Sequence, residues 1–165
     1  MADYILRPAE ERDLERVLGI ISIHDEAQEQ VARRFLKDYF HNKPDPSEAM
    51  HYVLEAQGEV VAVGGYIVDK QENICWIGLL YVDPYYRGQG LGTQLLNRVT
   101  QDTKKLGHDR LFVSVDQEDY SDTVIRFYTG NKFSNSSHCI KPPLEPIQQQ
   151  HTFCRKIDDK KPVEA

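Results

Sequence analysis

The feature that most constrains this chain is an apolar run that ends near a proline and leads through a glycine-rich turn into an amphipathic helix. The run Ile74–Val82 is almost continuously apolar, which is typical of a strand covered on both faces and predicts the centre of a sheet. Pro84 breaks this strand, and Gly88, Gly90 and Gly92 follow. The helix face predicted after the turn consists of Leu91, Leu95, Leu96, Val99 and Leu106, with Gly107 as the C-terminal stop.

The rest of the chain predicts one mixed α/β domain of the α+β kind, with an antiparallel first half. The runs Tyr52–Ala56 and Val60–Val68 are joined at Gln57-Gly58, where the glycine supplies the turn of a hairpin. The other expected elements are a strand at Tyr4–Leu6, helix faces at Leu14, Val17, Leu18 and Ile21 and at Val31, Phe35, Leu36 and Tyr39, a strand at Leu111–Val115, a helix at Ser121–Thr129 and strands at Ser137–Ile140 and Thr152–Ile157. We expect a domain over residues 1–157 and a charged, flexible tail over 158–165.

Composition excludes several classes of function. With 165 residues, 40% hydrophobic and 28% charged, the chain lies in the globular range. It has 20 Lys and Arg against 26 Asp and Glu, and the resulting charge of −6 disfavours nucleic acid as a partner. No apolar run approaches the roughly 20 residues that span a bilayer, and the first residues lack a signal-peptide pattern. We therefore expect a cytoplasmic protein without a membrane partner.

The cysteines and histidines give no support to a metal site. Cys75, Cys139 and Cys154 form no Cys-x-x-Cys pair, and the 6 histidines form no His-x-x-x-His pair. We expect reduced, buried thiols and no bound metal. His24 has two interpretations, one near a substrate and a simpler one as a surface or strand-edge histidine.

The glycine-rich turn has the chemistry of a diphosphate site. A turn that opens a helix exposes backbone N–H groups at the positive end of the helix dipole, and glycines allow a diphosphate to approach them. Arg87 adds a positive charge beside the turn. The dinucleotide-binding fingerprint fails because Thr93 stands where its third glycine belongs, and the NTPase phosphate-binding loop fails because no Gly-Lys-Ser/Thr is present. A glycine-rich helix start without a ligand remains the alternative.

These residues resemble a known family, the GCN5-related N-acetyltransferases (GNAT). Arg87-x-x-Gly90-x-Gly92 after a strand that ends Leu80-x-Val82-Asp83-Pro84 is similar to the acetyl-CoA motif of that family. The resemblance covers about Tyr4 to Phe133. Its further parts are Ile5-x-Arg7-Pro8-Ala9 with Asp13-Leu14, the hairpin Glu55-Ala56-Gln57-Gly58-Glu59-Val60-Val61-Ala62, and Phe127-Tyr128.

The resemblance implies a central mixed, mostly antiparallel sheet, flanked by helices and splayed at the fourth strand, with acetyl-CoA as cosubstrate in the notch. It implies that the pantetheine pairs with exposed strand backbone and that the turn holds the pyrophosphate. The residues matched to cofactor binding in this way are Leu80, Tyr81, Val82, Arg87, Gly88, Gln89, Gly90, Leu91, Gly92, Thr93 and Ser121, the last at a position that is often asparagine in the family.

Acyl transfer to an amine needs an uncharged amine, stabilisation of the oxyanion and a proton for the departing thiolate. By resemblance, strand backbone near Val82 meets the oxyanion and Tyr128 protonates the sulfur, although a buried tyrosine can equally be a core residue. The strand from Ile74 to Leu80 carries no carboxylate, so Asp116 is the candidate base, with Glu118 as a substitute through water. The alternative for Asp116 is a loop carboxylate that faces solvent.

One departure from the family pattern lies close to the expected site. Lys132 stands where the family usually has a glycine, and we expect Gly130 or Asn131 to take up the tight backbone instead. Trp76 is expected in the core. Tyr85 and Tyr86 are expected to pack in the loop or to line the acceptor tunnel. Acidic clusters near the acceptor side favour a cationic acceptor, although a solvated charged face explains them equally; they are Asp116, Glu118, Asp119 and Asp122, and Asp25, Glu26 and Glu29.

The sequence therefore predicts an acetyl-CoA-dependent N-acetyltransferase that acts by direct transfer in a ternary complex. The acceptor is expected to be a small cationic amine, or a protein lysine or N-terminus. The alternatives are a non-catalytic acyl-CoA-binding sensor or scaffold, and transfer to a hydroxyl or of a longer acyl group. The family resemblance also allows a homodimer.

Overall fold

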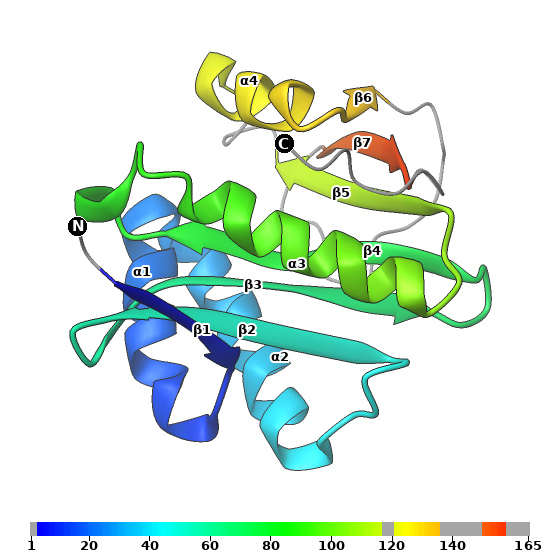
Figure 1. Cartoon of the computed structure of the whole chain (residues 1–165). Coiled ribbons are helices and arrows are strands. Elements are labelled where there is room, and N and C mark those ends of the chain that lie inside the picture. Colours follow the sequence, from blue (N-terminus) through cyan, green and yellow to red (C-terminus); the bar gives the residue numbers. More distant parts are fainter. Residues whose placement is uncertain (1–2, 117–120, 136–149, 158–165) are drawn as a thin grey trace.

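The computed structural model of the chain describes residues 3–116, 121–135 and 150–157. These residues form one seven-stranded sheet flanked by helices (Figure 1). In chain order the elements are β1 (Tyr4–Pro8), η1 (Glu11–Asp13), α1 (Leu14–His24), α2 (Glu26–Asn42), β2 (Ala49–Ala56), β3 (Glu59–Asp69), β4 (Ile74–Val82), η2 (Pro84–Tyr86), α3 (Leu91–Lys105), β5 (Arg110–Asp116), α4 (Asp122–Gly130), β6 (Ser134–Asn135) and β7 (Gln150–Lys156).

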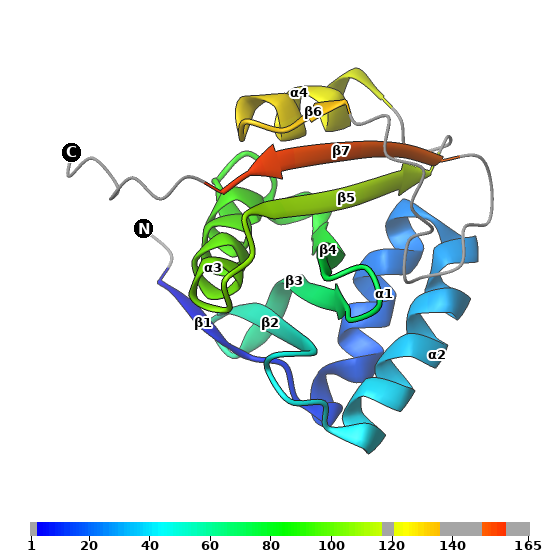
Figure 2. The ribbon, with the colours of Figure 1, turned by 90° about the vertical axis from the view of Figure 1, so that its right-hand side faces the viewer.

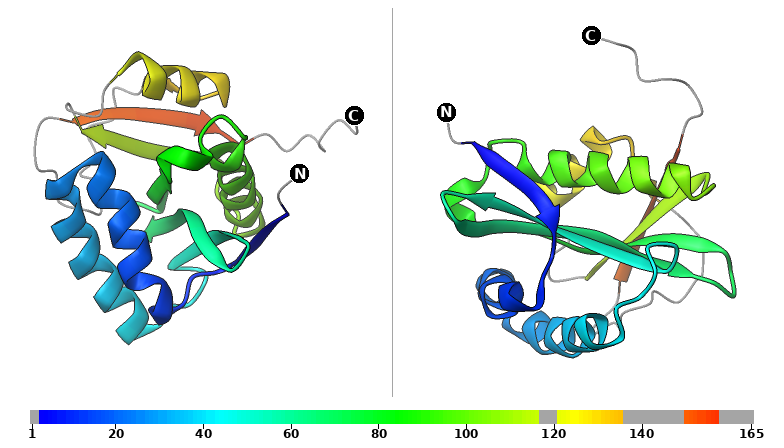
Figure 3. Two further views of the ribbon diagram at one scale, coloured as in Figure 1. Left: turned by 90° about the vertical axis from the view of Figure 1, so that its left-hand side faces the viewer. Right: turned by 60° about the horizontal axis from the view of Figure 1, so that its bottom comes forward.

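The sheet has the strand order β1-β2-β3-β4-β5-β7-β6. Each neighbouring pair is antiparallel except β4 and β5, which are parallel. A parallel pair needs a crossover connection, and α3 provides it. Helices α1 and α2 cover one face of the sheet and α3 covers the other (Figures 2 and 3). The expected α+β fold with an antiparallel first half is confirmed.

The periodic apolar faces predicted for α1 and α3 are the buried faces. In α1, Val17, Leu18 and Ile21 are buried against the sheet, and they pack with residues of β2 and β3. The predicted face of α3 is buried as well, over Leu91, Leu95, Leu96 and Val99. Leu106 is the exception at 39% exposed, because it follows the last residue of the helix.

Two turns contain residues in left-handed backbone, and the turn after α4 differs from the prediction. Gln57 and Gly58 both have positive φ, 51° and 79°, as a two-residue hairpin turn requires. After α4 the left-handed residue is Lys132, with φ 69°, so the expectation for Gly130 or Asn131 is wrong. The helix continues through Gly130, and Lys132 and Phe133 donate backbone N–H groups back to its last turn, which places the reversal at Lys132.

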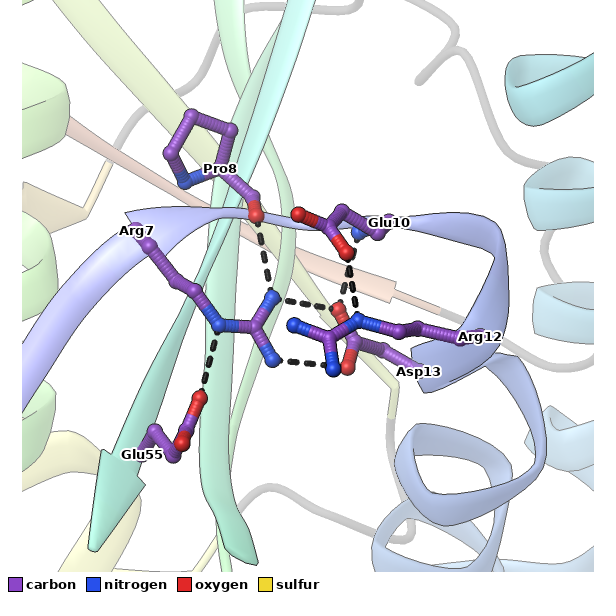
Figure 4. Close-up of polar contacts among 6 residues, drawn as sticks. All are labelled: Arg7, Pro8, Glu10, Arg12, Asp13 and Glu55. Carbon is purple, nitrogen blue, oxygen red and sulfur yellow. Dashed lines mark hydrogen bonds and ion pairs between the residues drawn. The ribbon is translucent and has the colours of Figure 1, made fainter. Parts of the chain in front are cut away.

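An ion-pair cluster around Arg7 fixes the start of α1 to the sheet (Figure 4). Arg7 of β1 donates to both carboxylate oxygens of Asp13, at 2.8 and 2.9 Å, and to Glu55 of β2 at 2.8 Å. Asp13 also accepts the backbone N–H of Glu10. Burial alone would raise the pKa of Asp13, but Arg7 and the Glu10 N–H outweigh it and hold that pKa below its usual value. The cluster ties β1, β2 and the entry to α1 together.

The remaining predictions concern the C-terminal strands, the tail and the cysteines. Cys139, the strand expected at Ser137–Ile140 and the tail 158–165 lie outside the described residues. The short strand β6, which the sequence did not predict, pairs with β7. Cys75 is buried as expected, and burial raises its pKa to about 12, whereas Cys154 is only partly buried.

Candidate active site

Strand β4 is paired along one edge and open along most of the other. It pairs with β3 from Ile74 to Val82, but with β5 only at Cys75 and Trp76. The register against β3 shifts at Gly65, which faces both Gly78 and Leu79 of β4. An extra residue of this kind bends its strand, and β4 leaves β5 at this bulge. The expected splay at the fourth strand is confirmed.

A cavity of about 840 Å³ occupies this notch. Its walls include residues from both faces of the sheet, such as Gln28 of α2 on one face and Phe127 of α4 on the other. Gln89 is not among the residues that line it, and its side chain accepts a hydrogen bond from the Tyr4 hydroxyl. The cofactor-binding and catalytic candidates that do line the cavity are Leu80, Tyr81, Val82, Arg87, Gly88, Gly90, Leu91, Gly92, Thr93, Ser121 and Tyr128.

The glycine-rich turn lies at one end of the cavity. Gly88 and Gly90 have φ of 76° and 78°, a region that other residues enter only with strain. Gly90 is the N-cap of α3, and no side chain caps that end of the helix. A Cβ on Gly92 would lie 3.1 Å from the ring of Phe127. The turn therefore presents uncapped helix N–H groups where side chains are missing, as expected for a diphosphate site.

The open edge of β4 offers backbone groups to the notch. The N–H of Asp83 donates to Val61 of β3 at 2.8 Å, so the carbonyl of the same peptide unit, that of Val82, points away from β3. Backbone direction alternates along a strand, so Leu80 also faces the notch, whereas Tyr81 faces β3 with its backbone. Leu80 and Val82 are therefore the residues of this edge whose backbone faces the notch.

His24 lines the cavity, which sequence reasoning did not favour. Its Nε2 lies 3.0 Å from the carbonyl oxygen of Val82, and both ring nitrogens lie 2.9 Å from the same guanidinium nitrogen of Arg87. Its ring meets the ring of Tyr81 edge to face. Burial lowers the pKa of His24, and the charge of Arg87 lowers it further. No local sequence signal predicts this contact, because His24 and Val82 are far apart in the chain.

Tyr128 is at once a core residue and part of the cavity wall. It is 7% exposed, stacks on Phe153 and meets the ring of Phe133 edge to face. Ser121 caps α4 by accepting the N–H of Val124, and it also lines the cavity. The two expectations for Tyr128, packing and contact with a ligand, are therefore compatible.

For the candidate base Asp116, the structure describes the backbone alone. Asp116 is the last residue of β5, and its backbone pairs with Gln150 of β7. Its side chain lies outside the described part of the structure, and so does the whole of Glu118. The end of β5 borders the notch, because Val113, Ser114 and Val115 line the cavity.

The described acidic residues of α2 point to other partners. Asp25 accepts the N–H of Ala27 as the cap of α2, and Glu29 accepts from Arg33 at 2.6 and 3.0 Å. The residues of α2 that line the cavity are Gln28, Val31 and Ala32, none of them acidic. Trp76 and Tyr86 also line it, whereas Tyr85 is 93% exposed.

The described residues contain neither a metal-binding cluster nor a membrane-spanning helix. Over residues 3–116, 121–135 and 150–157, no group of three His, Cys, Asp or Glu side chains is arranged to hold a metal ion. Within the same segments, no helix combines the length and apolar character needed to cross a membrane.

Comparisons with known proteins agree with this geometry. The model of the acetyltransferase (GNAT) family matches residues 9–133. A comparison with curated protein sequences found no match. Many solved structures share the fold, which confirms the expected fold class.

Three of these structures illustrate the range of proteins that share the fold. A GNAT-family acetyltransferase from Staphylococcus aureus Mu50 has a TM-score of 0.75 at 17% identity, over 94% of this chain and 100% of that one. The PaiA N-acetyltransferase from Thermoplasma acidophilum, solved with coenzyme A, has a TM-score of 0.67 at 16% identity, over 93% and 99% of the two chains. The N-acetylglutamate synthase from Neisseria gonorrhoeae, solved with coenzyme A and N-acetyl-glutamate, has a TM-score of 0.71 at 17% identity, over 96% of this chain and 36% of that one.

Proposed function

The chain belongs to the GNAT family of acetyltransferases, and from this premise we propose that it moves an acetyl group from acetyl-CoA to a primary amine by direct transfer in a ternary complex. Membership confirms the resemblance found in the sequence and makes the chain an acetyltransferase enzyme. The domain that does this is proposed to span residues 1–157.

One observation carries the proposal: the cavity in the notch begins at a glycine turn suited to a diphosphate and continues along an unpaired strand edge. A long donor with a diphosphate at one end and amide groups along its arm matches both parts. The turn fits because a Cβ at residues 88, 90 or 92 would strain or fill it. Coenzyme A in the Thermoplasma structure supports the same choice of donor.

The residues proposed to hold the donor have distinct tasks. Arg87 and the N–H groups at the start of α3 bind the diphosphate, because a guanidinium and helix N–H groups both favour an anion. Leu80 and the N–H of Val82 offer edge backbone to the amides of the arm, since the Val82 carbonyl accepts from His24. Gln89, which faces Tyr4, contributes its backbone rather than its side chain.

Bound acetyl-CoA supplies a thioester, an acyl group already activated for attack by an amine. In the proposed mechanism the acceptor loses a proton to Asp116, or to Glu118 through water, and its nitrogen becomes nucleophilic. Backbone N–H near Val82 stabilises the oxyanion. Tyr128 gives its proton to the thiolate that departs as the new C–N bond replaces the C–S bond.

The acceptor is proposed to enter from the side opposite the donor. The cavity reaches both faces of the sheet, so donor and acceptor can occupy it together, as direct transfer requires. A small cationic amine and a protein lysine or N-terminus both present the primary amine that this chemistry uses. A panel of amines, scored by thiol release from acetyl-CoA, separates these acceptors and also tests hydroxyl acceptors.

The first experiment is a melting curve with and without excess acetyl-CoA, with NAD as the control. A ligand at 100 times its Kd adds about 2.7 kcal/mol of stability, which raises the Tm of a domain of this size by roughly 5–10 °C. A rise with acetyl-CoA alone supports the proposal. No rise would mean that the turn is structural, and a rise without transfer to any amine would favour a sensor or scaffold.

A further inference from the structure

The hydrogen bonds of His24 define its tautomer. The carbonyl oxygen of Val82 can only accept, so Nε2 of His24 carries the hydrogen. One guanidinium nitrogen of Arg87, which can only donate, lies 2.9 Å from both ring nitrogens. With the hydrogen on Nε2, only Nδ1 can accept from it. The ring is therefore neutral and has a partner at each nitrogen, one on the open edge of β4 and one at the glycine turn.

Arg87 is a cation whose partner in the structure, the imidazole of His24, is neutral. No carboxylate in the described part of the chain forms an ion pair with it, whereas Arg7, Arg16 and Arg33 each bind carboxylates within 3.1 Å. A neutral imidazole gives Arg87 one hydrogen bond without an opposite charge. Arg87 is thus held in the cavity wall with its charge available to an anion.

A diphosphate would displace His24 as the partner of Arg87. Hydrogen bonds between guanidinium and phosphate join opposite charges and are often bidentate, whereas the neutral imidazole offers Arg87 a single acceptor without a charge. Nδ1 of His24 would then lose its donor while lying beside a doubly negative group. An imidazole in that position gains by taking up a proton, because imidazolium can donate to phosphate oxygen from Nδ1 and still donate to Val82 from Nε2.

Burial and the charges around His24 favour its neutral form in the protein without ligand. Without ligand, burial and the charge of Arg87 lower the pKa of His24, and the hydrogen bond with Val82 and the charge of Asp83 oppose them only in part. Asp83 is itself paired with Arg16 at 2.5 Å. The other titratable groups at this place are Tyr81 of β4, against the ring, and Asp25 and Glu26, which follow His24 at the start of α2. His24 is therefore neutral at pH 7 until an anion neutralises Arg87.

From this geometry we propose that His24 is a positioning residue for the diphosphate of the acyl donor: it holds Arg87 at the open edge of β4 and takes up a proton when the diphosphate replaces it as the partner of Arg87. The inference rests on the proposed function and adds to it a residue and a proton that the family resemblance did not include. Its consequence is that donor affinity rises as the pH falls.

The test is titration calorimetry of the whole chain with acetyl-dephospho-CoA, which keeps the diphosphate and lacks the 3′-phosphate that titrates near pH 6. For the wild type we expect Kd at pH 6 to be about three to ten times lower than at pH 8, since one pKa unit corresponds to a tenfold change. His24→Gln keeps an amide donor for Val82 but takes up no proton, so its Kd should be flat over this range. His41→Gln, on the exposed end of α2, is the control that keeps the wild-type slope.

One further measurement helps to distinguish a failure of the inference from a failure of the proposed function. Wild-type titrations at pH 6.5 in buffers of different ionisation enthalpy should show net proton uptake, and this reading does not depend on how well a variant folds. A wild type that binds without proton uptake, or a His24→Gln variant with the wild-type slope, overturns the inference and leaves the proposed function intact. A wild type that binds no donor at any pH overturns the proposed function, and the inference with it.

Discussion

Strand β4 meets its two neighbours in different ways, and the difference separates stability from function. Against β3 the pairing runs from Ile74 to Val82, so backbone groups are satisfied within the fold. Against β5 it covers only Cys75 and Trp76, and the rest of that edge faces the cavity. Buried backbone groups need partners, and in the proposed function the donor supplies them along the open edge. Changes at the open edge should therefore alter binding and transfer, and changes on the closed side should alter unfolding.

The largest effect is expected for Tyr128→Phe, at the open edge. Loss of the hydroxyl removes the proposed proton donor, which is worth about 100-fold or more in rate. The ring stays in place against Phe133 and Phe153, so the Tm and its rise with acetyl-CoA should change little. Thiol-release kinetics beside melting curves measure both. An unchanged rate would show that Tyr128 serves packing alone.

Gly90→Ala tests the turn against a matched change elsewhere. Gly90 and Gly58 have nearly the same φ, 78° and 79°, and open space around a new Cβ, so alanine costs about 1–2 kcal/mol of backbone strain at each. We expect Gly90→Ala to weaken acetyl-CoA binding about tenfold, because the strained turn shifts its N–H groups. Gly58→Ala should lower the Tm equally but leave affinity unchanged. Equal affinities for the two variants would contradict the diphosphate site.

On the closed side, His51 of β2 is expected to make stability depend on pH. It is fully buried over Gly65 and Gly78, and neither ring nitrogen has a hydrogen-bond partner among the described residues. Burial lowers its pKa to about 3, whereas the unfolded chain titrates near 6.5, so the unfolded state binds more protons between these values. Stability should be complete above pH 6.5 and fall by at most about 1.4 kcal/mol per pH unit below it.

Denaturant unfolding at pH 7, 6 and 5 measures this effect. His51→Leu should make the decline between pH 6.5 and 5 shallower, whatever it does to stability at pH 7. His41→Leu, at an exposed position of α2, should keep the wild-type decline. Identical slopes for wild type and His51→Leu would show that other groups control acid sensitivity.

The smallest effect is expected at Lys132, which follows α4 and belongs to neither edge of β4. A non-glycine residue in left-handed backbone lowers stability by about 1–2 kcal/mol, a cost that glycine avoids. The greater conformational entropy of glycine in the unfolded chain offsets about 0.5–1 kcal/mol of this advantage. Lys132→Gly should therefore stabilise the fold by about 0.5–1 kcal/mol and raise the Tm by roughly 1–4 °C, with transfer unchanged. Lys37→Gly, the same change on an exposed helical position, should lower stability by about 1 kcal/mol.

Sequence reasoning succeeded where local pattern decides structure. Strand β4 has the predicted bounds, and Gly107, with φ 90°, ends α3 as expected. The bulge of β4 also had a signal that was not used, because an isolated glycine such as Gly78 inside an apolar strand often marks one.

Sequence reasoning failed where distant segments decide. The contact of His24 with Val82 depends on how α1 packs against the end of β4, and Arg7 and Asp13 help to set that packing from the other end of the helix. No spacing in the chain encodes it. At the end of α4 the capping hydrogen bonds, rather than the nearest glycine, selected Lys132 for left-handed backbone.

The open edge of β4 also bears on self-association. An unpaired strand edge is a template on which another chain can add a strand, and proteins with such edges at their periphery tend to aggregate. Here the unpaired edge is in the interior of the sheet, between β4 and β5, and His24 already occupies one of its carbonyls. The outer strands of the described sheet are the five-residue β1, which ends in Pro8, and the two-residue β6. The fold thus places its open hydrogen-bonding edge inside the sheet and offers other chains only two short outer strands to extend.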